Sequence, residues 1–437
     1  MIETDAKEAN AEPTLPSSKP PFLRRVQIRG YKSIAFCDVT LEPLTLLVGR
    51  NGSGKSNFLD ALGFLKDIFE TNLLEAVRSR GGWKSMITRD STSEEITIGI
   101  DADYNSPGNV YVFHKTAHYS ITIKEGPFGV PYIAKEAFVY MNSQGQPKVK
   151  YTRIGRYYDQ LRPELRYTWE VHNLDLRHAE GSSRQDLPYL ATSGFPLFDH
   201  LANGFRYSGF YNFSPDLIRE PQRPDPGSLL DAKGKHLATA IENLQEADAG
   251  ALHRLKQYLT NIVYEVRQFE VIRSGERQLI QFHVRGSIPD KLQIFEAASM
   301  SDGTLRILAA LVAAFQIHRP TGPYLVAIEE PETSLHPAAM HALVDALDEA
   351  TLHTQILLTT HSAEMLDNPT IKPANVRVVQ MIDGQTVIAP VDEASVEIVK
   401  KKLNTLGGLE RENQLEPDTD DLERQRKLSL NGRSTNE

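Results

Sequence analysis

Short apolar runs alternate with helical repeats at both ends of the chain. Near its start, the run Leu44–Val48 predicts a buried strand, and apolar residues at three- and four-residue spacing over 58–69 predict an amphipathic helix. Much later, the run 324–328 predicts another buried strand between helices expected over 305–317 and 336–352. Buried strands that alternate with helices are typical of a parallel sheet covered by helices. We therefore expect both ends of the chain to build one α/β domain.

The middle of the chain has a different pattern. Alternating apolar and polar positions between residues 94 and 140 predict an antiparallel sheet, whereas residues 141–235 show no regular pattern. One or two helices are expected over 236–265, and two strands follow them. The expected divisions are a disordered tail over 1–21, an N-terminal head half over 22–80, an inserted β and helical subdomain over 81–290, a C-terminal head half over 291–410 and a flexible tail over 411–437.

Composition and charge are those of a soluble globular protein. Hydrophobic residues make up 40% of the 437 positions and charged residues 24%. The formal net charge of −9 argues against a surface that binds nucleic acid throughout, although a local basic patch is compatible with it. The single cysteine, Cys37, excludes an intrachain disulfide and a cysteine-based zinc site. Because no apolar run reaches the roughly 20 residues that cross a bilayer, we expect a cytoplasmic protein without a membrane segment.

Residues 49–56 fit the phosphate-binding pattern GxxxxGK[ST], and we call them the phosphate loop. The loop follows an expected strand and opens an expected helix, where backbone N–H groups and the helix N-terminus can meet phosphate oxygens. Lys55 is expected to reach the β- and γ-phosphates, and the Ser56 hydroxyl to ligate Mg²⁺. The sequence therefore predicts binding of a nucleoside triphosphate. The expected binding residues are Asn51, Gly52, Ser53, Gly54, Lys55 and Ser56.

Two adjacent carboxylates, Glu329 and Glu330, follow the strand expected over 324–328. Ligands of such sheets bind at the carboxyl ends of the strands, so both acids should lie beside the phosphates. One acid can hold the Mg²⁺ shell while its neighbour polarises the attacking water. Such a pair can instead simply cap the next helix, but the phosphate loop favours the catalytic interpretation.

Two weaker signals lie in the same half of the chain. The turn Ser301-Asp302-Gly303 precedes an apolar helix, where it can bind phosphate or act as an ordinary N-cap, and the cap is favoured on this segment alone. His361 follows the strand expected over 355–359 and could hydrogen-bond a γ-phosphate. A single histidine at a strand end is more often structural.

The order and spacing of these motifs resemble the ATP-binding cassette head of RecF/RecN/SMC-like ATPases, a group that includes the OLD-type ATPases. Within that group, the chain is most similar to stand-alone ATPases of bacterial defence loci. The passages SDGTLR (301–306) and EEPETSLHP (329–337) carry the resemblance, which covers about 22–70 and 296–395. It implies an ABC-type P-loop ATPase head with a split mixed sheet, together with an inserted antiparallel β and helical subdomain.

The resemblance also implies roles for single residues. Glu329 would be the Mg²⁺-associated acid, Glu330 the catalytic carboxylate and His361 the switch histidine. Residues 301–303 would be the signature segment, which touches the γ-phosphate of ATP held by a second copy of the chain. Residues 334–337 would cross the interface between the copies. ATP and Mg²⁺ would thus join two heads into a dimer.

The chain departs from the pattern of ABC proteins at three points. Glu329 replaces the more frequent aspartate, and the signature segment contains Asp302 where transporters have glycine. The glutamine of the glutamine loop is not placed, because the first glutamines after the phosphate loop, Gln144 and Gln146, lie in a polar turn. These departures leave the rate of hydrolysis open.

The expected partners follow from what the chain does not contain. Its longest helical run lacks the heptads of a long coiled-coil arm, and about 75 residues follow His361, too few for the nuclease domain of OLD nucleases. We therefore expect a slow ATPase that is the sensor or scaffold subunit of a bacterial anti-phage defence complex with a separate effector, a nuclease or toxin. Two alternatives stay open: a RecF-like repair ATPase that binds DNA, and a non-hydrolysing, nucleotide-gated scaffold that holds a toxic effector.

A basic run in the insertion motivates the first alternative. Basic side chains among aromatic ones can hold the phosphates and stack on the bases of DNA or RNA, although such runs are more often solvated surface or contact protein partners. The basic residues are Lys148, Lys150, Arg153, Arg156, Arg162 and Arg166, and the aromatic ones are Tyr151, Tyr157, Tyr158 and Tyr167.

Overall fold

The structure is a computed structural model. The expected tail over 1–21 lies outside the described residues, as do Gln144, Tyr158 and Arg162. The described residues are 22–89, 94–103, 116–141, 146–157, 165–172, 188, 196–225, 229–286, 291–316 and 325–434.

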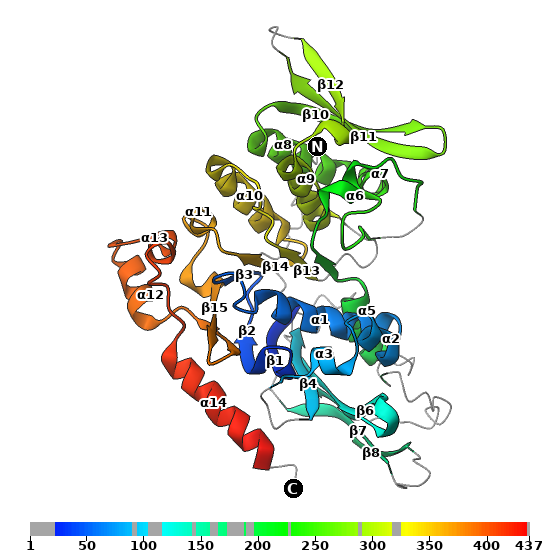
Figure 1. The fold of residues 1–437 in the computed structure, drawn as a ribbon, viewed down its shortest axis with the longest axis vertical. Coiled ribbons are helices and arrows are strands. Elements are labelled where there is room, and N and C mark those ends of the chain that lie inside the picture. Colours follow the sequence, from blue (N-terminus) through cyan, green and yellow to red (C-terminus); the bar gives the residue numbers. More distant parts are fainter. Residues whose placement is uncertain are drawn as a thin grey trace, which may run out of the picture.

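A six-stranded mixed sheet lies at the centre of the molecule (Figure 1). Its order is β16-β15-β3-β14-β13-β9, in which the five strands from β15 to β9 run parallel and β16 is antiparallel to β15. Its strands come from both ends of the chain, which confirms the expected split mixed sheet. The bounds are β3 Leu44–Val48, β9 Gly209–Tyr211, β13 Leu325–Glu329, β14 Gln355–Thr360, β15 Val376–Ile382 and β16 Gln385–Pro390.

Helices cover both faces of this sheet. Successive strand residues point to opposite faces, so Leu46 of β3 packs in one hydrophobic cluster with α7 to α10, and Leu47 packs in the other with α1. This arrangement confirms the expected helix-covered α/β domain. No helix in the described part of the chain is long and apolar enough to cross a bilayer. The helices are α1 Lys55–Glu70, α7 Leu237–Ala247, α8 Ala249–Ile262, α9 Asp302–Phe315, α10 Pro337–Ala350 and α11 Ala363–Leu366.

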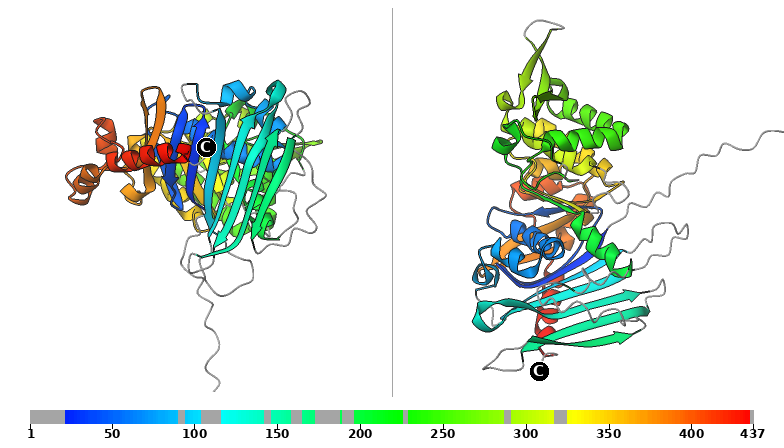
Figure 2. Two further views of the ribbon diagram at one scale, coloured as in Figure 1. Left: turned by 90° about the horizontal axis from the view of Figure 1, so that it is seen from below. Right: turned by 90° about the vertical axis from the view of Figure 1, so that its right-hand side faces the viewer.

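A seven-stranded antiparallel sheet packs on the other side of α1 (Figures 1 and 2). The antiparallel strands are present as expected. β4 pairs with β1 from Leu23 to Arg29, so the inserted strands continue the sheet of β1 and β2 in the order β2-β1-β4-β5-β6-β7-β8. The bounds are β1 Leu23–Tyr31, β2 Ile34–Thr40, β4 Glu95–Asp103, β5 Thr116–Glu125, β6 Pro131–Met141, β7 Pro147–Tyr157 and β8 Leu165–His172, with short helices α2 Leu73–Arg78, α3 Trp83–Met86 and α5 Pro196–Arg206 beside them.

The last part of the insertion belongs to the head. β9, with only three residues, forms an edge of the central sheet and is followed by α6 (Pro215–Arg219). A three-stranded sheet of β10 (Val266–Ser274), β11 (Arg277–Arg285) and β12 (Leu292–Glu296) packs on α7 and α8. Strands on both sides of residue 81 share a sheet, as β1 and β4 do, and so do β11 and β12 on the two sides of residue 290.

The basic run does not form one surface. It lies on β7 and β8, where alternate side chains point to opposite faces. Arg153 points into the core, is 2% exposed and pairs with Glu136, which is 0% exposed, at 3.1 Å. Tyr151 is buried as well, whereas Lys150 is exposed. The prediction of Arg153 and Tyr151 as surface residues is therefore wrong, because a strand within a two-layer arrangement buries every second residue.

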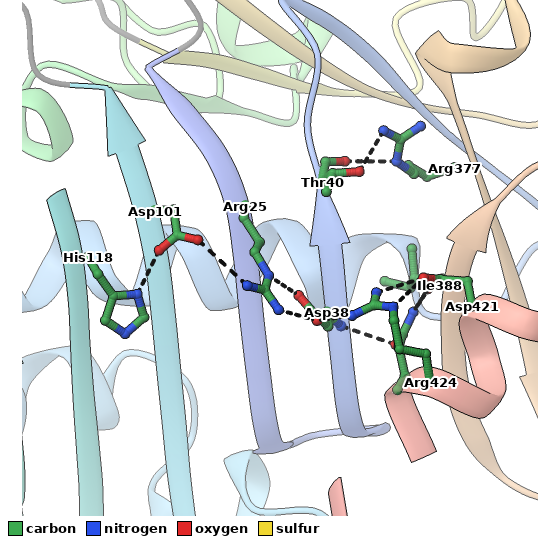
Figure 3. A network of polar contacts seen from close by, with 10 residues as sticks. Arg25, Asp38, Thr40, Asp101, His118, Arg377, Ile388, Asp421 and Arg424 are labelled. Atoms are coloured by element: carbon green, nitrogen blue, oxygen red, sulfur yellow. Dashed lines mark hydrogen bonds and ion pairs between the residues drawn. The ribbon is translucent and has the colours of Figure 1, made fainter. Parts of the chain in front are cut away.

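The segment expected as a flexible tail over 411–437 instead forms helix α14 (Thr419–Ser434), after α12 (Glu393–Lys400) and α13 (Leu406–Arg411). Figure 3 shows Arg424 of α14 directed at Asp38 of β2, with 2.7 Å between Nη1 and Oδ2. Gln425 is 4% exposed and donates to the Ile388 carbonyl of β16. The sequence suggested disorder because polar contacts, not an apolar stripe, hold this helix.

Candidate functional site

The phosphate loop connects β3 to α1. Gly54 occupies the N-cap position of α1 with φ 104°, a conformation that glycine adopts easily. A side chain here would collide with Thr386 of β16, whose hydroxyl donates to the Ser53 carbonyl at 2.8 Å. Ser53 is 4% exposed, and its Oγ has no hydrogen-bond partner within the protein. The loop thus places backbone N–H groups and a buried hydroxyl at the start of a 16-residue helix, as a phosphate site requires.

Lys55 lies beneath the loop with 5% of its surface exposed. Its Nζ donates to the carbonyls of Gly49 at 2.6 Å and Arg50 at 3.2 Å, so the ammonium group is held at the inner side of the turn. Burial lowers the pKa of Lys55. The carboxylates that act against this shift are Glu330, Glu332, Glu410 and Glu329.

Ser56 and Glu329 meet although 273 residues separate them. The Ser56 hydroxyl donates to Glu329 Oε2 at 2.6 Å. The register explains the contact, since Glu329 pairs with Thr359, and Thr359 pairs with Leu47 near the end of β3. Two oxygen ligands side by side suit Mg²⁺, which takes few protein ligands and completes its shell with phosphate and water. Among the described residues, no cluster of three or more His, Cys, Asp or Glu forms a metal cage of its own.

Glu330 leaves β13 in a strained conformation. Its φ is 42°, and its N–H donates to the Thr359 carbonyl at 3.0 Å. Left-handed backbone at a residue other than glycine costs about 1 kcal/mol or more and is concentrated at functional sites. The turn directs the carboxylate toward His361, with 3.8 Å between Oε1 and Nδ1. The two sequence-predicted residues are thus neighbours at the edge where the phosphate loop lies.

Glu332 is a third acid at this edge that the sequence did not single out. It is 4% exposed, and its Oε1 accepts from the Thr360 hydroxyl and from the His361 N–H at 3.4 Å. Its Oε2 is buried without a hydrogen-bond partner. Burial raises the pKa of Glu332. This carboxyl group therefore joins the loop after β13 to the end of β14, and the passage that carried the resemblance already contained it.

Glu410 of α13 is a further acid near the phosphate loop. Burial raises the pKa of Glu410, while Lys55, His361 and Arg50 act in the opposite direction. No sequence signal identified it, because it lies at the edge of the expected tail. A cleft of about 710 Å³ separates α13 from the loop and is lined by Gly49, Arg50, Asn51, Gly52, Ser53, Val378, Val379, Gln380, Met381, Glu410, Asn413, Leu415 and Glu416.

The sequence left the glutamine-loop residue unplaced. Gln146 is exposed immediately before β7 of the antiparallel sheet. Asn212 follows β9, the edge strand of the central sheet, and is exposed. Since Tyr211 pairs with Ile328, Asn212 lies level with Glu329 across the sheet edge. A three-residue strand inside an irregular stretch gave no periodic signal from which to find it.

The signature segment, 301–303, contacts a different set of residues. Ser301 caps α9, because its Oγ accepts from the Thr304 N–H at 3.2 Å. Gly303 lies against the loop after Glu330, where an added Cβ would approach the Ser334 carbonyl to 2.6 Å. Asp302 pairs with Arg219 of α6. The segment therefore packs between α6 and residue 334 at the start of α9. The ends of β13 and β14 instead lie beside the phosphate loop.

A family model described as "AAA domain, putative AbiEii toxin, Type IV TA system" matches residues 44–367. This span includes the phosphate loop, the adjacent acids Glu329 and Glu330, the signature segment and His361. It covers well over half of the chain.

Three curated proteins are similar in sequence. "Endonuclease GajA" of Bacillus cereus (strain VD045) is 23% identical over 393 residues, which are 87% of this chain and 62% of that protein. "DNA replication and repair protein RecF" of Arthrobacter sp. (strain FB24) is 28% identical over 96 residues, 20% of this chain and 24% of RecF. "OLD nuclease" of Thermus scotoductus (strain ATCC 700910 / SA-01) is 31% identical over 97 residues, which are 22% of this chain and 18% of that protein. The chain thus spans less than two thirds of the length of each relative.

Two solved SMC head structures share the fold. An Smc head bound to the C-winged helix domain of ScpA has a TM-score of 0.50 and 15% identity, covering 86% of this chain and 99% of that one. An Smc head with an extended coiled coil, from Pyrococcus furiosus, also has a TM-score of 0.50, with 13% identity and coverage of 88% and 100%. Together with the sequence relatives, they confirm the predicted ABC-type head and its RecF/SMC/OLD resemblance.

Proposed function

Because the chain belongs to this AAA-domain family, we propose that it is a Mg²⁺-dependent ATP hydrolase whose heads dimerise around ATP. The observation that supports this most is the 2.6 Å hydrogen bond from Ser56 to Glu329, directly beside Lys55. It brings the end of the phosphate loop and the acid of β13 to one point, as phosphate and metal binding require.

In this proposal, the phosphate loop and Lys55 hold the triphosphate. Lys55 exchanges its contacts with the Gly49 and Arg50 carbonyls for phosphate oxygens. Ser56 and Glu329 are the residues that would hold Mg²⁺, which supplies charge neutralisation for the phosphates when it is bound. Asn212, level with Glu329, would orient the same group of ligands.

Glu330 is the proposed general base. Its carboxylate accepts a proton from water while the water oxygen bonds to the γ-phosphorus and the bond from that phosphorus to the β,γ-bridging oxygen breaks. His361 donates a hydrogen bond to the γ-phosphate, and Glu332 fixes the backbone of His361. ADP and inorganic phosphate are the products. The fixed backbone of Glu330 would limit where its carboxylate can reach.

The dimer is supported by the contacts of the signature segment. The segment packs against α6 and residue 334, and it offers the N-capped start of α9 to a phosphate. A second copy, turned about a two-fold axis, would place its signature segment on ATP held by the first.

The proposed defence role rests on the names of the matching family and of one similar protein. The family description names a toxin of a type IV TA system, and one similar protein is named an endonuclease. On these two similarities we propose that it acts as the sensor or scaffold subunit of an anti-phage complex with a separate effector, a nuclease or toxin.

Two substitutions test the ATPase. Lys55→Ala should lower ATP affinity at least about 100-fold, because a buried cation for the phosphates is lost. Glu330→Gln should bind ATP and accumulate a dimer, because the base is removed while the phosphate contacts stay. On the full chain, isothermal titration measures ATP affinity, phosphate release measures hydrolysis and light scattering measures the dimer.

The outcomes separate the alternatives. Tight ATP binding by Lys55→Ala would contradict the phosphate-loop assignment. If Glu330→Gln released phosphate at the same rate as wild type, and both rates equalled the buffer background, the chain would be a non-hydrolysing nucleotide-gated scaffold.

One observation favours direct binding of nucleic acid as a second candidate function. Arg156 of β7 and Arg166 of β8 lie directly opposite each other, and both are exposed. Exposed arginines side by side on a strand pair can bind the phosphates of DNA or RNA. Lys150, exposed on the same face of β7, extends the basic surface. A salt-sensitive gel shift that disappears in Lys150→Glu/Arg156→Glu would support it, and no shift at low salt would exclude it.

A further inference from the structure

Asp302 presents an electrostatic difficulty for the proposed dimer. It is the first residue of α9, and its side chain is 53% exposed. The proposed function brings residues 301–303 to the γ-phosphate of a second copy. A carboxylate at that place repels a triphosphate, and like charges brought together at an interface weaken the association. The chain must therefore compensate the charge of Asp302.

Arg219 supplies that compensation from another element. It is the last residue of α6, and its Nη2 contacts Asp302 Oδ1, 83 residues away. The same nitrogen donates to the Met300 carbonyl at 3.2 Å, and Nη1 donates to Asp216 at 2.9 Å. One guanidinium group thus bonds to the Met300 carbonyl before Ser301 and to the Asp302 side chain after it.

These contacts do more than neutralise charge. Arginine presents donors in a rigid planar fork, so bonds to two acceptors fix their relative position. Ser301 lies between the two acceptors and already uses its Oγ to cap α9. Gly303 lies against the Ser334 carbonyl on the other side. The segment is therefore held between α6 and the loop after Glu330.

α6 is connected to the phosphate site of the same chain. Between Asn212, at the edge of the central sheet, and Arg219 there are only a few residues. Phe213 and Ile218 of this connection are buried, and Phe213 stacks on Tyr211 of β9 at 5.3 Å. A shift at the end of β9 would thus reach Arg219 through packed side chains.

We propose that Arg219 is a positioning residue that neutralises Asp302 and fixes the signature segment for ATP bound by a second copy. This inference rests on the proposed dimerisation around ATP. Arg219 then does not contact the ATP of its own chain, so its loss leaves ATP binding by one chain intact and weakens the ATP-dependent dimer.

The test uses the full chain in the Glu330→Gln background with ATP and Mg²⁺. Adding Arg219→Ala should raise the dimer dissociation constant by about tenfold, because the exposed carboxylate of Asp302 is then uncompensated. Adding Asp302→Asn to Arg219→Ala should restore dimerisation to within about threefold, because asparagine keeps the shape and removes the charge. Analytical ultracentrifugation measures the dimer, and isothermal titration at low protein concentration measures ATP binding.

Arg223→Ala is the matched control. Arg223 lies four residues after Arg219 and forms an exposed pair with Glu276. A dimer unchanged by Arg219→Ala, or a defect that Asp302→Asn does not relieve, would overturn the inference while leaving the dimer itself established. If Glu330→Gln alone formed no dimer, both the proposed function and this inference would be wrong.

Discussion

Glu332 has a buried carboxyl group with one oxygen bonded and one without a partner. A buried, unsatisfied oxygen is costly, more so when it carries charge. The protein retains it where the loop after β13 meets the end of β14, close to Lys55 and His361. We infer that this position holds the two strand ends together in an arrangement that the phosphates of ATP require.

The buried carboxyl group of Glu332 predicts a pH dependence of stability. Burial raises its pKa, so its contribution to stability is fully present below the ordinary value of about 4.3 and is lost as the pH rises through the folded value. Glu332→Gln removes this titration. The free energy of unfolding of wild type relative to Glu332→Gln should fall as the pH rises from 4 to 8, because the folded state resists ionisation of the buried carboxyl group. Urea unfolding without nucleotide measures it.

The control for this experiment is Glu423→Gln on the exposed side of α14. It should shift the curve equally at both pH values. Parallel pH profiles for wild type and Glu332→Gln would show that Glu332 ionises as an exposed carboxyl group does.

Residues inside a sequence motif were predictable, and residues brought in by the fold were not. The phosphate pattern and the acids after an apolar strand identified Lys55, Ser56 and Glu329, which the structure brings together. Glu410 and Asn212 belong to the same edge only because α13 and β9 end there. Nothing in their own neighbourhood in the sequence distinguishes them from surface residues.

At the scale of elements, α14 shows how a mostly polar helix can be held in place. Asp38 is 2% exposed and accepts hydrogen bonds from Arg25 and Arg424. Burial alone would raise its pKa, but these hydrogen bonds outweigh burial and lower it. The chain of charges continues through Arg25 to Asp101 and His118 on neighbouring strands (Figure 3). A helix that is held by such a network of charges needs no apolar stripe, so its sequence shows no apolar periodicity that would predict its docking.

Arg424→Ala should release α14 without unfolding the head. A hydrogen bond to a charged, buried group contributes about 1.5 to 3 kcal/mol, so local opening should become at least about tenfold more frequent. Proteinase K digestion followed by mass spectrometry should find faster cleavage between α13 and the end of α14.

Arg426→Ala, an exposed arginine two residues further along, is the control and should be cleaved at the wild-type rate. Equal cleavage of Arg424→Ala and wild type would mean that Gln425 and the remaining contacts suffice to hold the helix.

At the scale of the molecule, the expected split of the head is confirmed, and strands of the insertion share sheets with strands of the head. Apolar periodicity predicted the individual strands and helices well, because burial on one face leaves a local pattern. It could not predict that β4 would pair with β1 or that β9 would join the central sheet. Such pairings depend on which strand edges are free, and this information is spread over the whole chain.

The shared sheets predict that residues 81–290 do not fold alone. This fragment lacks β1, which pairs with its first strand β4, and α1, which covers its sheet. Expressed separately, it should show no cooperative thermal unfolding by circular dichroism, whereas the full chain should. A sharp transition in the fragment would contradict this prediction and show that the insertion folds by itself.

The place of β3 has a consequence for biosynthesis. Both neighbours of β3 in the sheet, β14 and β15, lie more than 300 residues further along the chain. At about 5 to 20 residues per second on the ribosome, the phosphate loop is made roughly 15 to 60 seconds before the strands that flank it exist. During that interval β3 has two free edges and an apolar sequence, the state most prone to aggregation. A nascent chain of this protein should therefore depend on chaperones until β15 emerges, and the phosphate loop gains its two flanking strands only late in synthesis.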